Sequence, residues 1–118
     1  MFKFIKTETF KHRVEVVVPS DDPDRPHRGS FVATSQRYGK ERLRELTDPD
    51  SGVGDQQFIR QTLVRVEGFE VEGIDPADQA ALREVIVEDI ALSSCYLRDY
   101  MAASASAAEK NSARSSRR

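Results

Sequence analysis

The sequence predicts an α+β fold, in which a small N-terminal antiparallel β-sheet of two or three strands packs with a C-terminal group of three to four helices. Over residues 2–38, apolar and polar side chains alternate with a period of two, which is typical of strands buried on one face. From residue 40 to 102 the apolar residues recur at helical spacing instead. The 118 residues suffice for one hydrophobic core.

The first predicted strands lie before residue 20. Residues 2–7, FKFIKT, have the alternation of a strand, and residues 10–19, FKHRVEVVVP, have it again. We expect the chain to break or bend near Thr9, between the two segments. In the second segment alternate valines share one face of the strand: Val14, Val16 and Val18.

A long polar loop separates these strands from the next one. Residues 20–30 are dense in Asp and Pro and contain a glycine near their end, so we predict no regular structure there. Residues 30–38, SFVATSQRY, resume the alternation with Phe31, Ala33 and Ser35 on one face. The resulting sheet is expected to keep its other face in water.

After Gly39 the period changes to that of a helix. Residues 40–47, KERLRELT, form the first predicted helix, which the Pro and Gly residues of DPDSGVGD end. Residues 55–66, DQQFIRQTLVRV, place apolar residues on one stripe, with Asp55 as the expected N-cap. The β-branched residues at the end of this segment fit a strand equally well, so both alternatives stay open.

The clearest helical signal lies between residues 75 and 102. Asp75 and Pro76 are typical of an N-cap and the first position of a helix. One straight helix would rotate the apolar stripe away from a compact sheet, so we expect a break near Glu88 and Asp89. The expected apolar face consists of Ala81, Leu82, Val85, Ile86, Ile90, Leu92, Tyr96, Leu97, Tyr100 and Met101.

These segments give one α+β domain over residues 1–102, with strands over about 2–38 and helices over about 40–102. Residues 103–118 contain no apolar side chain larger than alanine. Burial cannot offset the entropy of ordering such a segment, so we predict a disordered Ala/Ser/basic tail.

Composition restricts the class of protein. No apolar run approaches the roughly 20 residues that a membrane span needs, and the N-terminal residues are charged throughout, unlike a signal peptide. We therefore expect a cytoplasmic protein that contacts no membrane. The single cysteine, Cys95, is expected to be a small apolar residue of a helix, with no disulfide.

Groups that could carry chemistry form no pattern typical of a catalytic or metal site. His12 falls in a strand and His27 in the polar loop, and neither has a Cys, Ser or second His at the spacing of a metal site or a catalytic triad. The aspartates of SDDPDRP lack the closing glutamate of a calcium loop. We therefore expect no enzyme, no cofactor and no metal.

Charge is distributed unevenly along the chain. Residues 1–44 carry ten Lys/Arg against six Asp/Glu, whereas residues 67–89 carry eight acids against one base, Arg83. Residues 103–118 are again basic, with four bases against one acid. The acidic middle is either a solvated surface with internal ion pairs or a surface for a basic partner protein.

Several short motifs resemble those of the tail assembly chaperones of long-tailed bacteriophages. That family has an N-terminal strand pair followed by a helical half. The helical half begins with D-x-x-F-[IL], contains an aromatic helix and ends with [AG]-x-[AE]-K-N. A Gly-Trp pair of the family is absent here, and Phe69 of EGFEV is the candidate for its place. The positions that match are Asp55, Phe58, Ile59, Tyr96, Tyr100, Ala108, Glu109, Lys110 and Asn111.

The resemblance implies a non-catalytic protein of the bacterial host cytoplasm that binds the phage tape-measure protein and brings tail-tube subunits to it. It also implies two product lengths, the longer one made by a ribosomal frameshift. Glu109, Lys110 and Asn111 can be encoded GAA AAA AAC, which contains the slippery heptamer A AAA AAC. The Ala/Ser segment before it would serve as a hinge to a second domain.

Candidate contacts to a partner are the aromatic, branched and thioether side chains of the helical half, which suit adaptable binding. Each of them also fits a core position, and a homo-oligomer through the same surface stays open. The terminal strand FKFIKT is a further candidate edge. The candidate partner-binding residues are Phe58, Ile59, Phe69, Tyr96, Tyr100 and Met101.

Two other functions remain as alternatives. The same elements would suit another small virion component, such as a head-tail joining or tube protein. The basic segments KNSARSSRR and RYGKERLR would suit a nucleic-acid adaptor. The chain is acidic overall and Tyr38 alone gives no stacking platform, so we do not expect nucleic acid as the partner.

Overall fold

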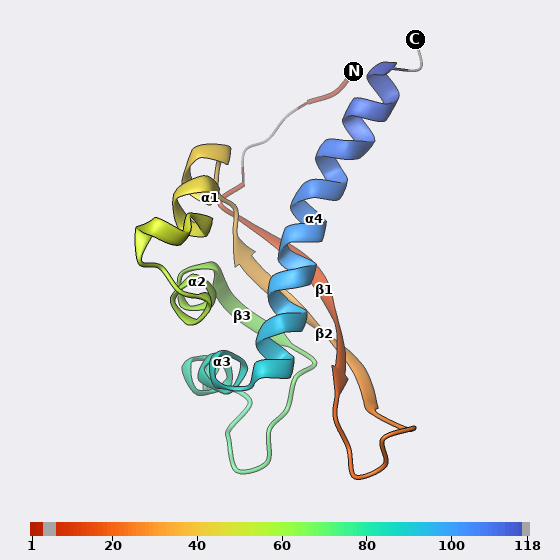
Figure 1. The fold of residues 1–118 in the computed structure, drawn as a ribbon, viewed down its shortest axis with the longest axis vertical. Helices are drawn as coiled ribbons and strands as arrows, with labels where there is room; N and C mark the ends of the chain where they lie inside the picture. Colours follow the sequence, from red (N-terminus) through yellow and green to blue (C-terminus); the bar gives the residue numbers. More distant parts are fainter. Residues whose placement is uncertain (4–6, 117–118) are drawn as a thin grey trace.

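The computed structural model describes the backbone of residues 1–3 and 7–116 and the side chains of residues 1–3 and 7–104. Within these residues the chain forms a three-stranded antiparallel sheet and four α-helices, two of which lie in sequence between the second and third strands. The predicted α+β class is confirmed. The helices cover one face of the sheet (Figure 1).

The sheet consists of β1 (Thr9–Val18), β2 (His27–Gln36) and β3 (Leu63–Glu67), in that order. β1 and β2 pair over their whole length, from Thr9 opposite Gln36 to Val18 opposite His27. β3 is shorter and pairs only with the C-terminal half of β2, from Val32 opposite Glu67 to Ser35 opposite Leu63.

The predicted faces of the two long strands are confirmed. Val14 is fully buried and Val16 and Val18 are partly buried against the core, because alternate residues of a strand point to the same side. Phe31, Ala33 and Ser35 of β2 are buried on the same side of the sheet.

The prediction of a separate strand before Thr9 was wrong for the described residues. Phe2, Lys3 and Thr7 lie outside any strand, while residues 4–6 lie outside the description. β1 starts at Thr9, where a break was expected, because β2 ends opposite it at Gln36 and a strand needs a partner. The polar loop is also shorter than predicted, since β2 begins at His27.

The first helical segment was predicted correctly, and the second was predicted correctly only in part. α1 covers Lys40–Thr47, and a short 3₁₀ turn follows at Pro49–Ser51. α2 covers Asp55–Thr62 with Gly54 rather than Asp55 at the N-cap. The next residues form β3, so the strand alternative is the one observed and strands extend beyond residue 38.

The long C-terminal helical region is broken where it was expected. α3 (Gln79–Glu88) and α4 (Ile90–Ser116) are separated at Asp89, whose side chain accepts a hydrogen bond from the Leu92 N–H. The predicted start of α3 was wrong. Asp78 caps it by accepting from the Ala81 N–H, whereas Asp75 closes a preceding turn onto the Ala77 N–H.

The core lies between the sheet and the helices α2, α3 and α4. Its largest fully buried side chains are Tyr96, Tyr100, Ile59, Leu63, Leu82 and Ile86. Cys95 is buried and free, as expected. Ile90, predicted to belong to the apolar face, is 84% exposed because it is the first residue of α4, at the turn between two helices.

α4 continues past Ala102, the predicted end of the domain. Alanine and several of its polar neighbours have high helix propensity, so the backbone can stay helical without an apolar face to bury. The side chains of the predicted Ala/Ser/basic tail from residue 105 on lie outside the description, and the disorder of residues 103–118 stays a prediction.

Replacing Asp78 by alanine is expected to lower the free energy of unfolding by about 1 kcal/mol, the usual value of a side-chain N-cap. Asp55→Ala is the matched control, because Asp55 follows the cap of α2 and contributes only through the helix dipole. Urea unfolding of both variants measures the difference. Equal losses would contradict the assignment of Asp78 as the cap.

Candidate functional site

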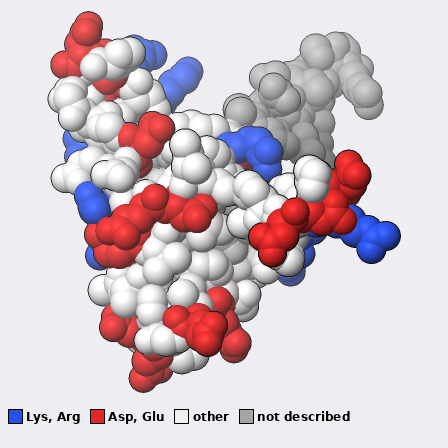
Figure 2. Space-filling view, turned by 60° about the horizontal axis from the view of Figure 1, so that its bottom comes forward, with Lys and Arg blue, Asp and Glu red and all other residues white. Residues whose placement is uncertain are grey.

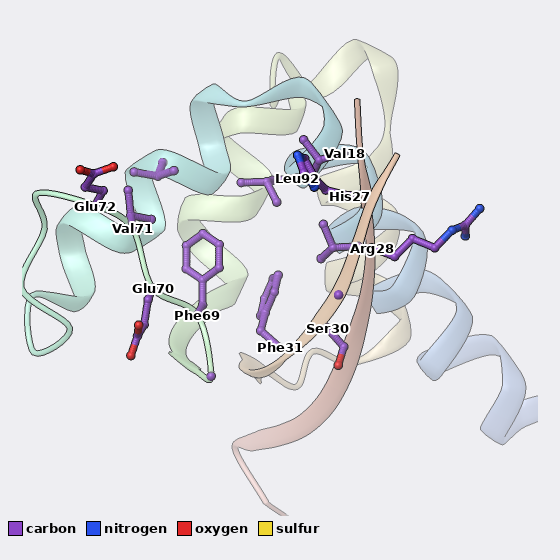
Figure 3. Close-up of a pocket in the computed structure, with 14 residues that line it drawn as sticks. Val18, His27, Arg28, Ser30, Phe31, Phe69, Glu70, Val71, Glu72 and Leu92 are labelled. Atoms are coloured by element: carbon purple, nitrogen blue, oxygen red, sulfur yellow. The ribbon is translucent and has the colours of Figure 1, made fainter. Parts of the chain in front are cut away.

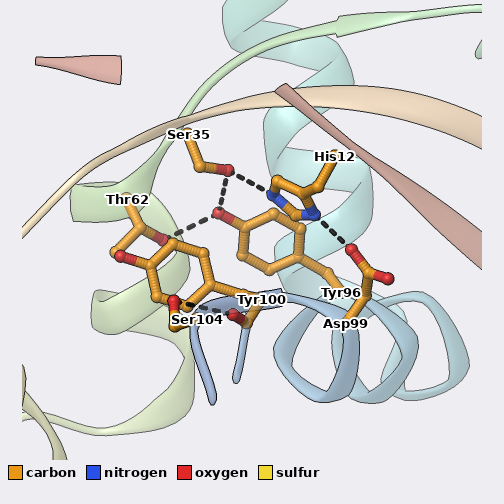
Figure 4. A network of polar contacts seen from close by, with 7 residues as sticks. All are labelled: His12, Ser35, Thr62, Tyr96, Asp99, Tyr100 and Ser104. Atoms are coloured by element: carbon orange, nitrogen blue, oxygen red, sulfur yellow. Dashed lines mark hydrogen bonds and ion pairs between the residues drawn. The ribbon is translucent and has the colours of Figure 1, made fainter. Parts of the chain in front are cut away.

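A buried polar network joins both long strands to two helices. The ring of His12 (β1) faces Asp99 (α4) through Nδ1 and Ser35 (β2) through Nε2, the latter at 2.8 Å. The Tyr96 hydroxyl of α4 lies 2.8 Å from Ser35 Oγ and 2.9 Å from Oγ1 of Thr62 in α2. Figure 4 shows these side chains converging between the sheet and α4.

The network can be satisfied as one directed chain of hydrogen bonds. A carboxylate only accepts, so His12 Nδ1 donates to Asp99 and its Nε2 accepts from the Ser35 hydroxyl. Ser35 then accepts from Tyr96, and the single hydroxyl proton of Thr62 is shared between the Tyr96 oxygen and the Phe58 carbonyl, each 2.9 Å from Thr62 Oγ1. These proton positions are assigned from the network, and they leave each of the five groups with a partner.

The chain Ser35–His12–Asp99 has the connectivity of a serine-hydrolase triad, which sequence reasoning missed. The surroundings argue for a structural role. Ser35 is 0% exposed and its oxygen is held by Tyr96, so a substrate carbonyl has no access to it in this conformation. Neither Ser35 nor His12 lines the two surface cavities described below.

Aromatic rings pack around this network. Phe10 stacks on His12 with ring centroids 5.1 Å apart, and Phe58 meets Tyr100 edge-on at 5.5 Å. Burial raises the pKa of Tyr96 to about 12 and that of Tyr100 to about 12, so both hydroxyls keep their protons at neutral pH. The Tyr100 hydroxyl donates to the Gln36 carbonyl and fixes α4 against β2 a second time.

Most of the predicted partner-binding residues lie in this core. Phe58, Ile59, Tyr96 and Tyr100 are at most 3% exposed, so they form no open surface in this conformation. Phe69 is partly buried, and Met101 is 36% exposed. The side chains of Glu109, Lys110 and Asn111 lie outside the description.

One surface cavity has a volume of about 310 Å³ and lies between α4 and the segment that joins α1 to α2. Its rim carries two carboxylates, Asp48 and Asp55. Its apolar lining consists of Leu46, Val53, Phe58, Leu97 and Met101, and we call it the α4 hollow.

A second cavity of about 500 Å³ lies between the hairpin end of β1 and β2, the segment that follows β3, and the helices α3 and α4. Phe31 and Phe69 pack against one another in its lining, with ring centroids 5.2 Å apart (Figure 3). Its apolar floor consists of Phe31, Phe69, Val71, Val85 and Leu92, and we call it the β2-edge groove.

The predicted acidic middle is partly paired and partly open. Arg60 of α2 donates hydrogen bonds from Nε and Nη2 to the carboxylate of Glu84 in α3, and this hydrogen bonding lowers the pKa of the Glu84 carboxyl. Glu70 and Glu72, beside the β2-edge groove, are exposed and form no ion pair among the described residues. Figure 2 shows acidic side chains dominating the lower end of the molecule.

Among the residues that the structure describes, no group of three or more His, Cys, Asp or Glu side chains is arranged to hold a metal ion. No helix in the same part of the chain is both long and apolar enough to cross a bilayer.

The alternation of residues along the two long strands indicated that polar side chains enter the core. His12 is in register with the buried Val14, and Ser35 with Phe31 and Ala33, so both polar side chains had to enter the core with a partner. The partner from α4 could not be chosen without the crossing of that helix over the sheet.

Tyr96→Phe is expected to lower the free energy of unfolding by about 1–3 kcal/mol, because it withdraws a buried partner from Ser35 and from Thr62. Tyr38→Phe is the matched control, since its hydroxyl makes one partly buried bond to the Gln61 carbonyl and should cost about 1 kcal/mol or less. Thermal and urea unfolding measure both. A Tyr96→Phe variant no less stable than the control would contradict the network's role.

Comparison of this chain with protein-family models, with curated proteins and with solved structures finds no match.

Proposed function

We propose that this protein is a tail assembly chaperone of a long-tailed bacteriophage. In this role it works in the cytoplasm of the bacterial host, binds the tape-measure protein and helps to recruit tail-tube subunits, without catalysing a reaction. The proposal rests on the motif resemblance together with one observation, the apolar α4 hollow at the surface of the helical half.

The hollow has the chemistry that an amphipathic helix needs. Leu97 and Met101, four residues apart on α4, form one wall, and Phe58 closes the floor. Methionine adapts to differently shaped apolar partners, and a groove of this kind accepts side chains at i, i+3 and i+4 of a helix. Its volume of about 310 Å³ is enough for a few such side chains.

The charge at the rim favours a helix with basic residues beside its apolar stripe. Asp48 and Asp55 border the hollow, and neither forms an ion pair among the described residues. Complementary charges of this kind select the partner and accelerate encounter more than they add affinity. A tape-measure protein is expected to present long amphipathic helices of the required type.

Of the residues that match the family motifs, Asp55 and Phe58 line the hollow, whereas Ile59, Tyr96 and Tyr100 lie in the core beneath it. Asp55, Phe58 and Ile59 form the start of α2, and Tyr96 and Tyr100 anchor α4 to the sheet. Together they fix the two helices between which the hollow opens. The main apolar contacts in this proposal come from Leu97 and Met101, which are among the more exposed apolar residues of the lining.

No observation favours the alternatives to the same extent. In the basic segment 37–44, Arg42 forms an ion pair with Glu45, and its guanidinium carbon lies 6.0 Å from the centre of the Tyr38 ring. Part of the positive charge of this segment is therefore neutralised within the protein. A head-tail joining or tube protein would form rings by itself, which the experiment below registers.

Met101→Asp is expected to abolish binding of a tape-measure protein of the same phage, since it places a carboxylate in the apolar contact. The measurement is co-purification from cells that express both proteins, together with the soluble fraction of the tape-measure protein. Val64→Asp is the matched control, because Val64 is 43% exposed on β3 and does not line the hollow.

The control should retain the tape-measure protein as the parent does. Equal retention by the parent and both variants would contradict the α4 hollow as the binding site. Failure of the parent to retain it, with ring assembly or salt-sensitive retardation of DNA instead, would contradict the chaperone function.

The frameshift gives a second expected outcome at the level of the gene. We expect Glu109, Lys110 and Asn111 to be encoded GAA AAA AAC, and expression should yield a minor longer product that departs from this sequence after Asn111. Changing the Lys110 codon to AAG keeps the protein unchanged and should remove the longer product, as measured by mass spectrometry. A longer product that survives the silent change would contradict the slip site.

A further inference from the structure

We propose that the β2-edge groove binds residues 2–7 of a second copy of this chain, which add as an extended strand to the unpaired half of β2. The proposal concerns a different surface from the α4 hollow and does not depend on the chaperone function.

The hydrogen-bonding pattern of the hairpin identifies the open edge. The Arg37 N–H donates to the Glu8 carbonyl at 2.8 Å, which makes Glu8 and Arg37 a hydrogen-bonded pair. Such pairs recur at every second residue, so the residues of β2 with even numbers direct their backbone groups away from β1. At Val32 and Thr34 these groups meet β3, but β3 does not extend to Ser30 and Arg28.

Side-chain hydrogen bonds satisfy the outer backbone groups of β3, whereas the corresponding groups in this half of β2 have no such partner among the described residues. On β3, the Val66 N–H donates to the side-chain oxygen of Gln79 at 2.9 Å, and the Gln79 amide donates to the Val66 carbonyl at 3.2 Å. The outer edge of β1 alternates charged side chains on its solvent face, which discourages pairing. Among the described residues, no strand or side-chain amide takes the corresponding place beside Ser30.

The groove continues this edge with an apolar floor. The partly buried ring of Phe69 lies against it, packed on the buried Phe31, while the side chain of Arg28 points away (Figure 3). Gly29, between Arg28 and Ser30, carries no side chain, and no atom lies within 4 Å of the place where its Cβ would be. A strand laid along Ser30 would therefore place alternate side chains over Phe69 and its apolar neighbours Val71 and Val85, the arrangement used in strand addition.

The occupant is inferred from charge and pattern. Glu70 and Glu72 border the groove without ion-pair partners among the described residues, so a basic strand is favoured. Residues 2–7, FKFIKT, alternate aromatic residues with Lys3 and carry no acid. They lie outside the sheet wherever the structure describes them.

The segment cannot fill the groove of its own copy. Figure 1 shows the N-terminus at the opposite end of the molecule from the hairpin tip. From Glu8 to Glu15, which lies opposite Ser30, the strand runs about 23 Å, whereas residues 1–7 span at most about 24 Å when fully extended. No residue would remain to pair, so the strand must come from a second copy.

Two variants of the full chain test the proposal by sedimentation equilibrium. Ser30→Pro removes the N–H that faces the groove without removing a bond to β1, and Phe2→Asp with Phe4→Asp removes the apolar contacts of the strand. Each should weaken self-association about tenfold, the effect of one or two lost backbone hydrogen bonds or apolar contacts. Val17→Pro is the matched control, since its N–H faces the outer edge of β1, and it should associate as the parent does.

A labelled peptide of residues 1–8 gives an independent readout by fluorescence anisotropy. It should bind the Phe2→Asp, Phe4→Asp variant and bind the Ser30→Pro variant about tenfold more weakly, with circular dichroism verifying that the variant is folded. A parent chain that remains at 13.3 kDa at high concentration would overturn the proposal. So would equal weakening by Ser30→Pro and Val17→Pro, or equal binding of a scrambled peptide, which would point to a partner of another sequence.

Discussion

The structure depends on one buried hydroxyl, that of Tyr96. It lies in a core where an unpaired polar group is costly, and its partners Ser35 and Thr62 come from the sheet and from α2. The observed position of α4 over the sheet provides partners for all three groups together with His12 and Asp99. Apolar packing holds the layers together, and this network determines how they are aligned.

The position of α4 in turn shapes both surface cavities. Leu92, near its start, closes the β2-edge groove, and Leu97 and Met101, further along, form a wall of the α4 hollow. The two cavities lie at different places on the molecule and differ in form. The groove follows an open strand edge, whereas the hollow lies between helices.

Local patterns in the sequence predicted the elements that local interactions decide. The alternation in β1 and β2, the helix Lys40–Thr47 and the break at Asp89 were all correct. The segment Leu63–Glu67 stayed ambiguous because pairing with β2 decides its conformation. The candidate site was predicted less well, since aromatic residues such as Tyr96 and Phe58 fit a core and an interface equally until the crossing of the helices is known.

Native-state amide hydrogen exchange tests most directly whether the Tyr96 network fixes α4 to the sheet. If it does, the amides of residues 95–100 and those of Ala33 and Val14 open with the same free energy, as one cooperative unit. Tyr96→Phe should then lower the opening free energy of α4 and sheet together. Exchange of α4 at a much lower free energy than the sheet, unaffected by this substitution, would contradict the network as the organising interaction.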